Sequence, residues 1–360
     1  MKSDVSRFLI FFINILGFIL LLNFFFDSFS ILGSYNNLLI LLFVICIISL
    51  PLIQNRSNLD RILSLIGLIL VISSTFFNQF SYLAIIVLFY IIFKYIISTY
   101  DKDDEEEIKK KHKNLNLKSK FNEVLSLSLS FINPFQLFQQ IILFLGELIL
   151  SFKKTYVSKE DYKQKTDFNL PFRGEWFVAN GGFTKKTSHS WNLKTQRFAY
   201  DFIKVDNEQK SHNSSGKELK DYYCYSEPIL SPADGKVIKV HDGISDHKNP
   251  GNMKIDFLAR DFRGNFVIIK HQDDEYSLLA HLIPGSIKVK EGENIKKGKK
   301  IGKCGNSGHS TEPHLHFQVQ NHPNFFLGNS LPIKFSNLKV NQEFYKSFYI
   351  NKGYKVENNN

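Results

Sequence analysis

The chain contains little cysteine, and its cysteines form no framework. Only three cysteines occur in 360 residues. Cys46 lies in an apolar run, and Cys224 and Cys304 are 80 positions apart in the sequence. No Cys-x-x-Cys pair is present, which excludes the common cysteine-based zinc and dithiol redox motifs.

The chain also lacks any stacked-aromatic or arginine-rich motif of the kind that binds nucleic acid. Its formal net charge is +11, from 45 Lys and Arg against 34 Asp and Glu. Beside the apolar N-terminal part of the chain, this charge favours an anionic membrane surface or a cell-wall polymer as neighbour. We therefore expect no nucleic acid among the partners, and we expect a lipid bilayer to be one.

Long apolar runs fill the first hundred residues and predict four transmembrane helices, each near the roughly 20 residues that a bilayer core requires. The runs cover about residues 8–26, 36–53, 62–77 and 80–97. The first run lacks a small-residue cleavage site, so a removed signal peptide is the weaker interpretation. Basic residues before the first run, between the second and third, and after the fourth predict cytoplasmic positions there. Residues 101–120, rich in Asp, Glu and Lys, read as a charged cytoplasmic linker.

Residues 121–152 predict either a fifth membrane crossing or an amphipathic helix lying in the membrane interface. The segment is long and apolar enough to span, but Gln136, Gln139 and Glu147 are costly in hydrocarbon. Counting charges, a fifth crossing places residues 153–360 outside the membrane, and its absence leaves them in the cytoplasm. We favour the crossing, hence an integral membrane protein with an extracytoplasmic C-terminal domain, because the function inferred below has its substrate outside.

From residue 153 onward the sequence predicts a mainly antiparallel β domain, extending to residue 345. No helix-length amphipathic pattern interrupts residues 172–320, and short strands punctuated by glycine recur. We expect strands at 228–240, 264–271, 275–282, 287–289 and 314–320, with a turn at 231–235 inside the first of these, followed by a strand at 236–240. Residues 346–360 read as a polar tail, disordered from about residue 354.

Two histidines on one predicted strand provide the centre of a candidate site. The run His-Leu-His-Phe-Gln-Val-Gln alternates with period two, so His314 and His316 lie on one face, opposite Leu315 and Phe317. One imidazole can bind a metal ion while its neighbour faces whatever the metal binds. Taken alone, such a pair is more often two polar residues on a solvated strand.

Three further residues can surround this pair. His281 ends an alternating strand just before the turn Pro284-Gly285, although a lone histidine there is more often half-buried and structural. Asp201 lies between aromatic residues and must find a partner, either a metal or a basic side chain, because burying it alone is costly. His189 lies in a Gly-, Ser- and Thr-rich loop that can fold over the same cleft.

Several separated motifs, in the same order, resemble the lysostaphin/LytM-type zinc endopeptidases over about residues 170–335. They include Ser231-Pro-Ala-Asp-Gly, Gly264-Asn-Phe-Val-Ile-Ile-Lys-His271, Leu279-Ala-His281-Leu, Val289–Gly302 and Gly305–Phe317. The resemblance implies a LytM/lysostaphin-like β-sandwich domain, one Zn²⁺ ion per chain that activates a water, and hydrolysis of peptide bonds in peptidoglycan.

The resemblance also implies roles for the five residues. His316 and Asp201 would bind the metal, and His281 and His314 would be catalytic without binding it. The usual first ligand, a histidine four residues before the aspartate, is replaced here by Arg197, which cannot bind zinc. A variant branch of the family takes this ligand from an earlier loop, so we expect His189 to be the third metal ligand, with His212 as the second choice.

The leading hypothesis is therefore a membrane-anchored, zinc-dependent peptidoglycan endopeptidase. The alternative is a catalytically inactive relative that binds cell wall or a partner and regulates another hydrolase. Arg197 favours this alternative, whereas the retention of the other histidines argues against it. A lipoyl- or biotinyl-like carrier domain, resembling the hairpin at 289–301, would leave His314 and His316 unexplained and lacks a suitably placed lysine.

Overall fold

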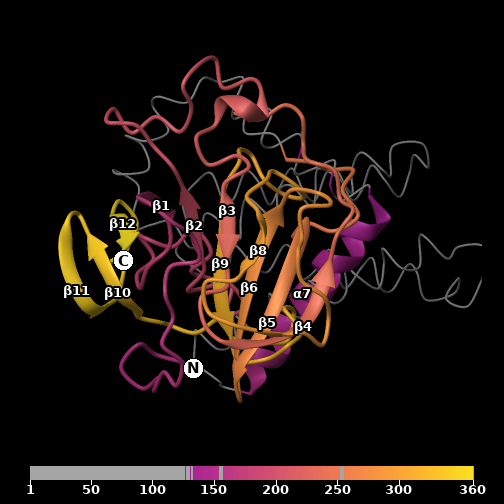
Figure 1. The fold of residues 1–360 in the computed structure, drawn as a ribbon. Helices are drawn as coiled ribbons and strands as arrows, with labels where there is room; N and C mark the ends of the chain where they lie inside the picture. The colour runs from indigo at the N-terminus through magenta and orange to yellow at the C-terminus, as the bar shows by residue number, and fades with distance from the viewer. Residues whose placement is uncertain (1–125, 127–129, 131–132, 154–156, 252–254, 360) are drawn as a thin grey trace, which may run out of the picture. The chain divides into compact units, whose positions relative to one another are not determined.

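The computed structural model describes residues 133–153, 157–251 and 255–359, together with residues 126 and 130 (Figure 1). All of them belong to one compact unit, residues 110–360. The four transmembrane helices predicted in residues 1–100 and the linker at 101–120 lie outside the described residues.

A ten-stranded sheet, antiparallel at every pairing, organises this unit. Its strand order is β11-β10-β12-β1-β2-β9-β6-β5-β4-β7, and β3 and β8 form a separate pair. The strands are β1 (Trp176–Asn180), β2 (Tyr200–Ile203), β3 (Pro228–Leu230), β4 (Gly235–His241), β5 (Asn265–Gln272), β6 (Glu275–Leu282), β7 (Asn294–Ile295), β8 (Lys300–Lys303), β9 (Leu315–Gln320), β10 (Phe335–Val340), β11 (Glu343–Phe348) and β12 (Lys355–Asn358). The mainly antiparallel β prediction is confirmed.

The predicted strands agree with the structure where hydrophobic alternation is strong. The predictions at 264–271, 275–282 and 314–320 match β5, β6 and β9 to within one residue. The prediction at 228–240 is divided into β3 and β4 by a turn in which the Ser231 hydroxyl donates to the Ala233 carbonyl over 2.7 Å. The strand predicted at 287–289 is wrong. Lys288 N–H makes a single hydrogen bond to the Ile301 carbonyl, without ladder pairing.

The prediction of a polar, disordered tail is also wrong. Residues 355–358 form β12, which lies inside the sheet between β10 and β1. Val356 is 1% exposed and pairs with Trp176 on one side and Val340 on the other. Two neighbouring strands satisfy its backbone, so a four-residue strand with a single apolar residue is stable here although its composition resembles a tail.

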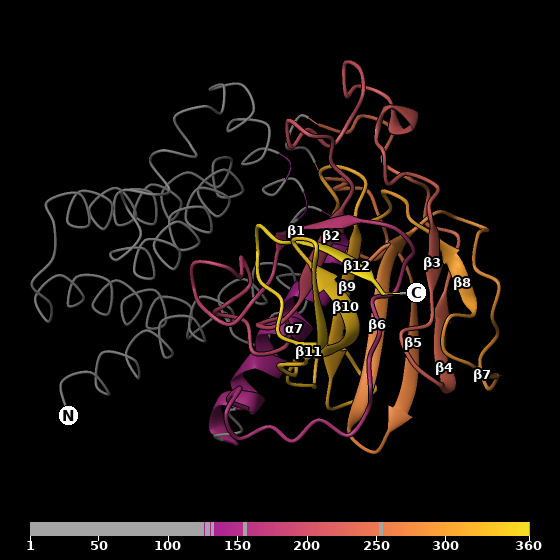
Figure 2. The same cartoon turned by 60° about the vertical axis from the view of Figure 1, so that its left-hand side comes forward.

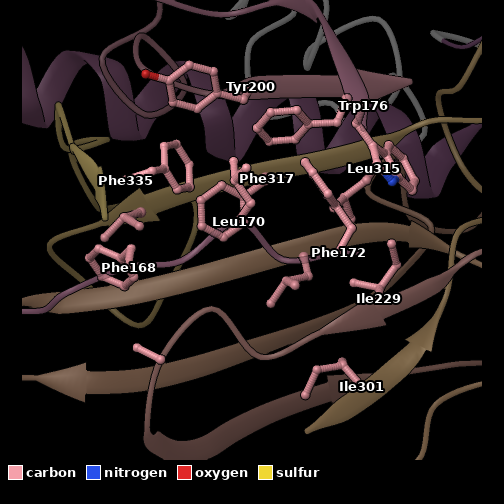
Figure 3. Close-up of a cluster of buried hydrophobic side chains, with 14 of the residues drawn as sticks. Phe168, Leu170, Phe172, Trp176, Tyr200, Ile229, Ile301, Leu315, Phe317 and Phe335 are labelled. Atoms are coloured by element: carbon pink, nitrogen blue, oxygen red, sulfur yellow. The ribbon is translucent and has the colours of Figure 1, made fainter. Parts of the chain in front are cut away.

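The two faces of the sheet bury different side chains, as alternation requires. One face carries a core of large aromatic and aliphatic residues, in which Phe172 stacks on Trp176 and Phe317 packs near Phe335 (Figure 3). The opposite face buries a smaller cluster in which Phe266, Ile268, Leu278 and Ala280 pack against Phe325 and Phe326. Helix α7 (Pro134–Phe152) lies against this face of the sheet (Figure 2). Its Ile142 and Leu143 pack against the second cluster.

Helix α7 is attached to the β domain through its polar side chains. Asn133 caps its start by accepting from Phe135 N–H, and the proline at the next position suits a helix beginning. Gln136 donates to the carbonyls of Asp256 and Ala259 over 2.8 and 2.9 Å. At Gly146 the helix lies so close to the Phe326 carbonyl that any side chain would clash with it.

Within the described part of the chain, α7 is the one helix long and apolar enough to span a membrane. Length and apolar composition are weak evidence for a membrane crossing, because the core helices of soluble proteins and signal sequences share both properties.

Candidate active site

Three neighbouring strands bring the predicted site residues together on the face of the sheet that α7 covers. Strand β9 lies between β2 and β6, and its register pairs His316 with Asp201 on one side and with Ala280 on the other. Tyr200, Phe202, Leu315 and Phe317 fill the opposite core. The alternation of β2 and β9 therefore turns Asp201 and His316 toward the same side.

A β-bulge brings His281 to the same side. Ala280 faces the α7 cluster, so regular alternation would point His281 into the opposite core. Asn265 of β5 pairs with Leu282 of β6, and Val267 pairs with Leu279, so β6 has one extra residue between these two pairs. Within this bulge, His281 takes a φ of +61°. Bulges and left-handed residues re-aim side chains and are frequent beside active sites.

Asp201 is the centre of the group. His316 Nδ1 lies 3.0 Å from Asp201 Oδ1, and His314 Nε2 lies 3.7 Å from the same oxygen. The other carboxylate oxygen is 3.4 Å from His189 Nδ1 and accepts from the Asn180 amide over 3.3 Å. Burial opposes ionisation of Asp201, but the charge of His189 and the hydrogen bond from His316 outweigh it and hold its pKa well below the usual value. The carboxylate is thus ionised and surrounded by imidazoles.

The two predicted catalytic histidines have their protons placed by backbone carbonyls. Nδ1 of His281 is 2.7 Å from the Ser307 carbonyl, and Nδ1 of His314 is 2.8 Å from the Glu312 carbonyl. A carbonyl only accepts, so Nδ1 carries a hydrogen in each ring, and whenever the ring is neutral its lone pair is on Nε2. The two ring centres are 4.7 Å apart. Burial, followed by repulsion from His314 and His316, lowers the pKa of His281 well below its usual value, which favours the neutral ring.

His189 reaches the group from the long connection between β1 and β2. Its side chain is 47% exposed, against 11% for Asp201, so it covers the carboxylate from the solvent side. Arg197, at the position of the usual ligand, points elsewhere: Nε donates to the Trp191 carbonyl over 2.8 Å, and the guanidinium lies over the Trp191 ring. His212, the second choice, packs on Tyr222 and contacts the Ser214 carbonyl.

The donor set of His189, Asp201 and His316 fits zinc in its chemistry, since it offers two imidazoles and one carboxylate, and the two distances to the carboxylate are comparable to those between zinc ligands. Two tetrahedral zinc ligands at about 2.0–2.2 Å from the ion lie about 3.4 Å from one another. The carboxylate is 3.4 Å from His189 and 3.0 Å from His316. Within the described ranges no three such side chains already surround one ion position. Asp201 instead bonds directly to His316, a contact that an ion between the two side chains would replace.

Sequence reasoning missed one polar residue behind the site. Gln318 is fully buried, and its Oε1 lies 3.2 Å from His316 Nε2, the nitrogen that does not face Asp201. The alternation that placed His314 and His316 on one face also includes Gln318, so the signal was present in the sequence.

Comparison with known proteins identifies the family of this chain. Residues 221–326 match the Peptidase family M23. Lipoprotein NlpD of Yersinia enterocolitica is 30% identical over 94 residues, which cover 26% of this chain and 77% of that protein. The chain belongs to peptidase family M23. The predicted family resemblance is thereby confirmed.

Other relatives share a smaller part of their length with this M23 chain. The peptidoglycan DD-endopeptidase ShyB of Vibrio cholerae is 36% identical over 118 residues, covering 32% of this chain but 23% of ShyB. The catalytic domain of lysostaphin from Staphylococcus simulans is 20% identical over 48% of this chain and 90% of its own length, with a TM-score of 0.24, too low to carry an argument.

The segment that matches the M23 family contains only part of the site. His281, His314 and His316 lie within residues 221–326, whereas Asp201 and His189 precede them. Assignment of the last two to the M23 site therefore depends on the distances described above.

Proposed function

We propose that this M23 protein is a zinc-dependent endopeptidase that hydrolyses peptide bonds of peptidoglycan. The observation that carries the proposal is the convergence of four imidazoles around Asp201, with His189 reaching the carboxylate although Arg197 occupies the usual ligand position. Peptidoglycan is chosen as substrate because relatives such as ShyB are named as peptidoglycan endopeptidases.

In this proposal His189, Asp201 and His316 hold one zinc ion, and His281 and His314 move protons. Zinc, when bound, supplies a Lewis acid that polarises a carbonyl and acidifies water. The Nε2 atoms of His281 and His314 are the proton-accepting atoms of neutral rings whose Nδ1 hydrogens are bound to carbonyls. One ring accepts the proton that the attacking water loses, and this proton passes to the departing amine nitrogen as the C–N bond breaks, either from the same ring or after transfer to the other.

The test is zinc content and cleavage of purified peptidoglycan by the full-length protein and by His189→Ala, with His212→Ala as the matched control. We expect about one zinc per chain and cleavage in the wild type and in the control, and loss of both in His189→Ala. Full zinc content and activity in His189→Ala would remove His189 from the ligand set.

A second candidate, the inactive relative that regulates another hydrolase, is favoured by Arg197 alone. It predicts a wild-type protein that binds the cell wall without cleaving it. Release of new amino groups from purified peptidoglycan distinguishes the two, because hydrolysis of each peptide bond creates one amine whereas binding creates none.

For membrane placement, we propose that α7 lies in the bilayer interface and does not cross it. Its polar side chains bond to the β domain from one end to the other: Asn133, Gln136 and Gln139 to residues 256–262, and Glu147 to residues 194 and 195. A helix crossing hydrocarbon cannot keep such contacts along its length.

The outward face of α7 carries exposed apolar side chains. These are Phe135, Phe138, Phe144, Leu145 and Ile149, each 44–63% exposed. Leu258 and Leu327, 72% and 39% exposed, lie in loops that contact the helix.

With α7 on the surface, the four spans predicted in residues 1–100 would leave the domain in the cytoplasm, away from the cell wall. We propose the extracytoplasmic side, which, for a cytoplasmic N-terminus, requires an odd number of crossings before α7 in place of the predicted four. Protease accessibility of the C-terminal domain in intact cells tests this: digestion without permeabilisation is expected, and protection would contradict wall hydrolysis.

The membrane contact of α7 is tested separately. Replacing Phe138 and Leu145 by Ser should weaken association of residues 110–360 with phospholipid vesicles.

A further inference from the structure

Helix α7 contacts the loop that carries His189 through one carboxylate. Glu147 Oε2 accepts from Lys194 N–H, and Oε1 accepts from both the N–H and the hydroxyl of Thr195, each over 2.9 Å. Hydrogen bonds to an ionised acceptor are about twice as strong as neutral ones. Lys194 also donates from its ammonium group to the Leu150 carbonyl over 3.0 Å. The end of the loop is thus fixed to the last two turns of α7.

The residue that Glu147 holds leads to the second imidazole ligand as well. Thr195 is fully buried, and its carbonyl accepts from Gln318 Nε2 over 3.0 Å. The other end of the same amide, Oε1, lies 3.2 Å from His316 Nε2. Gln318 Nε2 also donates to Gln320 Oε1 over 2.8 Å, which sets the orientation of the amide. A continuous series of hydrogen bonds therefore runs from α7 to His316.

We infer that Glu147 is a positioning residue for the zinc site, holding the His189 loop and, through Thr195 and Gln318, the ring of His316. This inference rests on the proposed function, since it takes these histidines as ligands. The physical reason is that His189 lies on the long connection between β1 and β2 and is half-exposed. Because it belongs to neither strand, the hydrogen bonds of the sheet do not hold it in place. Groups that orient ligands from behind commonly change metal affinity by about 10–100-fold when removed.

Zinc binding then depends on an element outside the segment that matches family M23, because α7 precedes residue 221. Displacement of α7 from the β domain would release Lys194 and Thr195 together with it. A shift of α7 at the membrane would then move the His189 loop, and zinc binding at that loop would in turn affect the position of α7.

The test compares Glu147→Ala with Gln139→Ala in the full-length protein in detergent. Gln139 also bonds α7 to the β domain, at Arg260 and Phe262, but it does not contact the His189 loop. Zinc affinity is measured by competition with a chromophoric chelator, and thermal unfolding is measured on the metal-free proteins. We expect Glu147→Ala to weaken zinc binding about 10–100-fold and Gln139→Ala to leave it within about threefold of wild type.

A conservative variant separates positioning from general destabilisation. Glu147→Gln keeps an oxygen for the two Thr195 donors and loses only the acceptor for Lys194, so it should recover most of the zinc affinity. Equal zinc affinity in wild type and Glu147→Ala, or equal losses in Glu147→Ala and Gln139→Ala, would overturn the inference. Failure of the wild type to bind zinc would instead overturn the proposed function, so the two failures are distinguishable.

Discussion

The two halves of the candidate site are held in different ways. His281, His314 and His316 lie on or directly beside strands in the middle of a sheet, where ladder hydrogen bonds and two cores determine their positions. His189 lies on a connection between β1 and β2, and contacts outside that connection determine its position. A metal ligand on a strand is held in position by the rigid sheet, whereas the position of a ligand on a loop depends on the side chains that bind the loop.

The largest effect should follow from removing the carboxylate at the centre. Asp201→Ala deletes the carboxylate that lies within 3.7 Å of His189, His314 and His316, and with it one of the three proposed metal ligands. We expect zinc binding to be lost and cleavage of purified peptidoglycan to fall at least about 1,000-fold, as when a group that acts as part of a unit is removed. Glu343→Ala, on the distant strand β11, is the control and should change neither quantity. An active Asp201→Ala protein would place the reaction elsewhere.

The next effect concerns the rigidity of the strand-held half. Phe317 is fully buried and lies between His316 and Gln318 in β9. Phe317→Ala should lower the free energy of unfolding by about 3–5 kcal/mol, because it leaves a cavity in the main core. Chemical denaturation measures this, with the exposed Phe344→Ala as control. If both variants lost the same stability, β9 would not be anchored by the core as described.

Acid should destabilise the region where α7 packs on the loop before His314, because it places a charge on a buried histidine. His309 Nε2 lies 2.5 Å from Gln136 Oε1, and burial, opposed by the charge of Asp261, lowers the pKa of His309 to about 4. Since the unfolded value is about 6.5, the unfolded chain binds the proton first, so this stability is complete above pH 6.5 and lost as the pH falls toward 4. The loss from this group should reach up to about 3 kcal/mol.

The measurement for His309 is the free energy of unfolding at several pH values for the wild type and His309→Gln, which keeps an amide donor for Gln136. Other groups titrate in both proteins, so their difference isolates His309. The wild type should lose more stability than the variant between pH 6.5 and 4, and parallel curves would show that His309 does not contribute.

The smallest effect is expected at Arg197. Arg197→Ala removes the hydrogen bond to the Trp191 carbonyl and the cation–π contact with its ring, together roughly 1–2 kcal/mol of loop stabilisation. Because Glu147 and Gln318 still hold Thr195, we expect cleavage to decrease only about three- to tenfold. His189→Ala measured in parallel should be far more damaging. A larger loss in Arg197→Ala would mean that Arg197 contributes directly to the site.

Much of the strand-held half was predictable because alternation is a local property. The period of two in residues 314–320 placed His314 and His316 on one face, and the strand at 275–282 placed His281 near its end. The bulge that turns His281 to that face was not predictable, because it is a mismatch between two strands. The strand β12 was missed for the same reason, since its neighbours stabilise it more than its own residues do.

The amino-acid sequence by itself determined the family, the antiparallel β fold and the pair of histidines, His314 and His316, that lies beside Asp201, because motifs and alternation act over a few positions. Only the tertiary structure decided that His189 lies beside Asp201 and that His212 does not. It also decided that Glu147 of α7 binds the loop that joins His189 to Asp201. Those contacts join residues 12 to 48 or more positions apart. No local pattern specifies such contacts, since they depend on how packed elements approach one another.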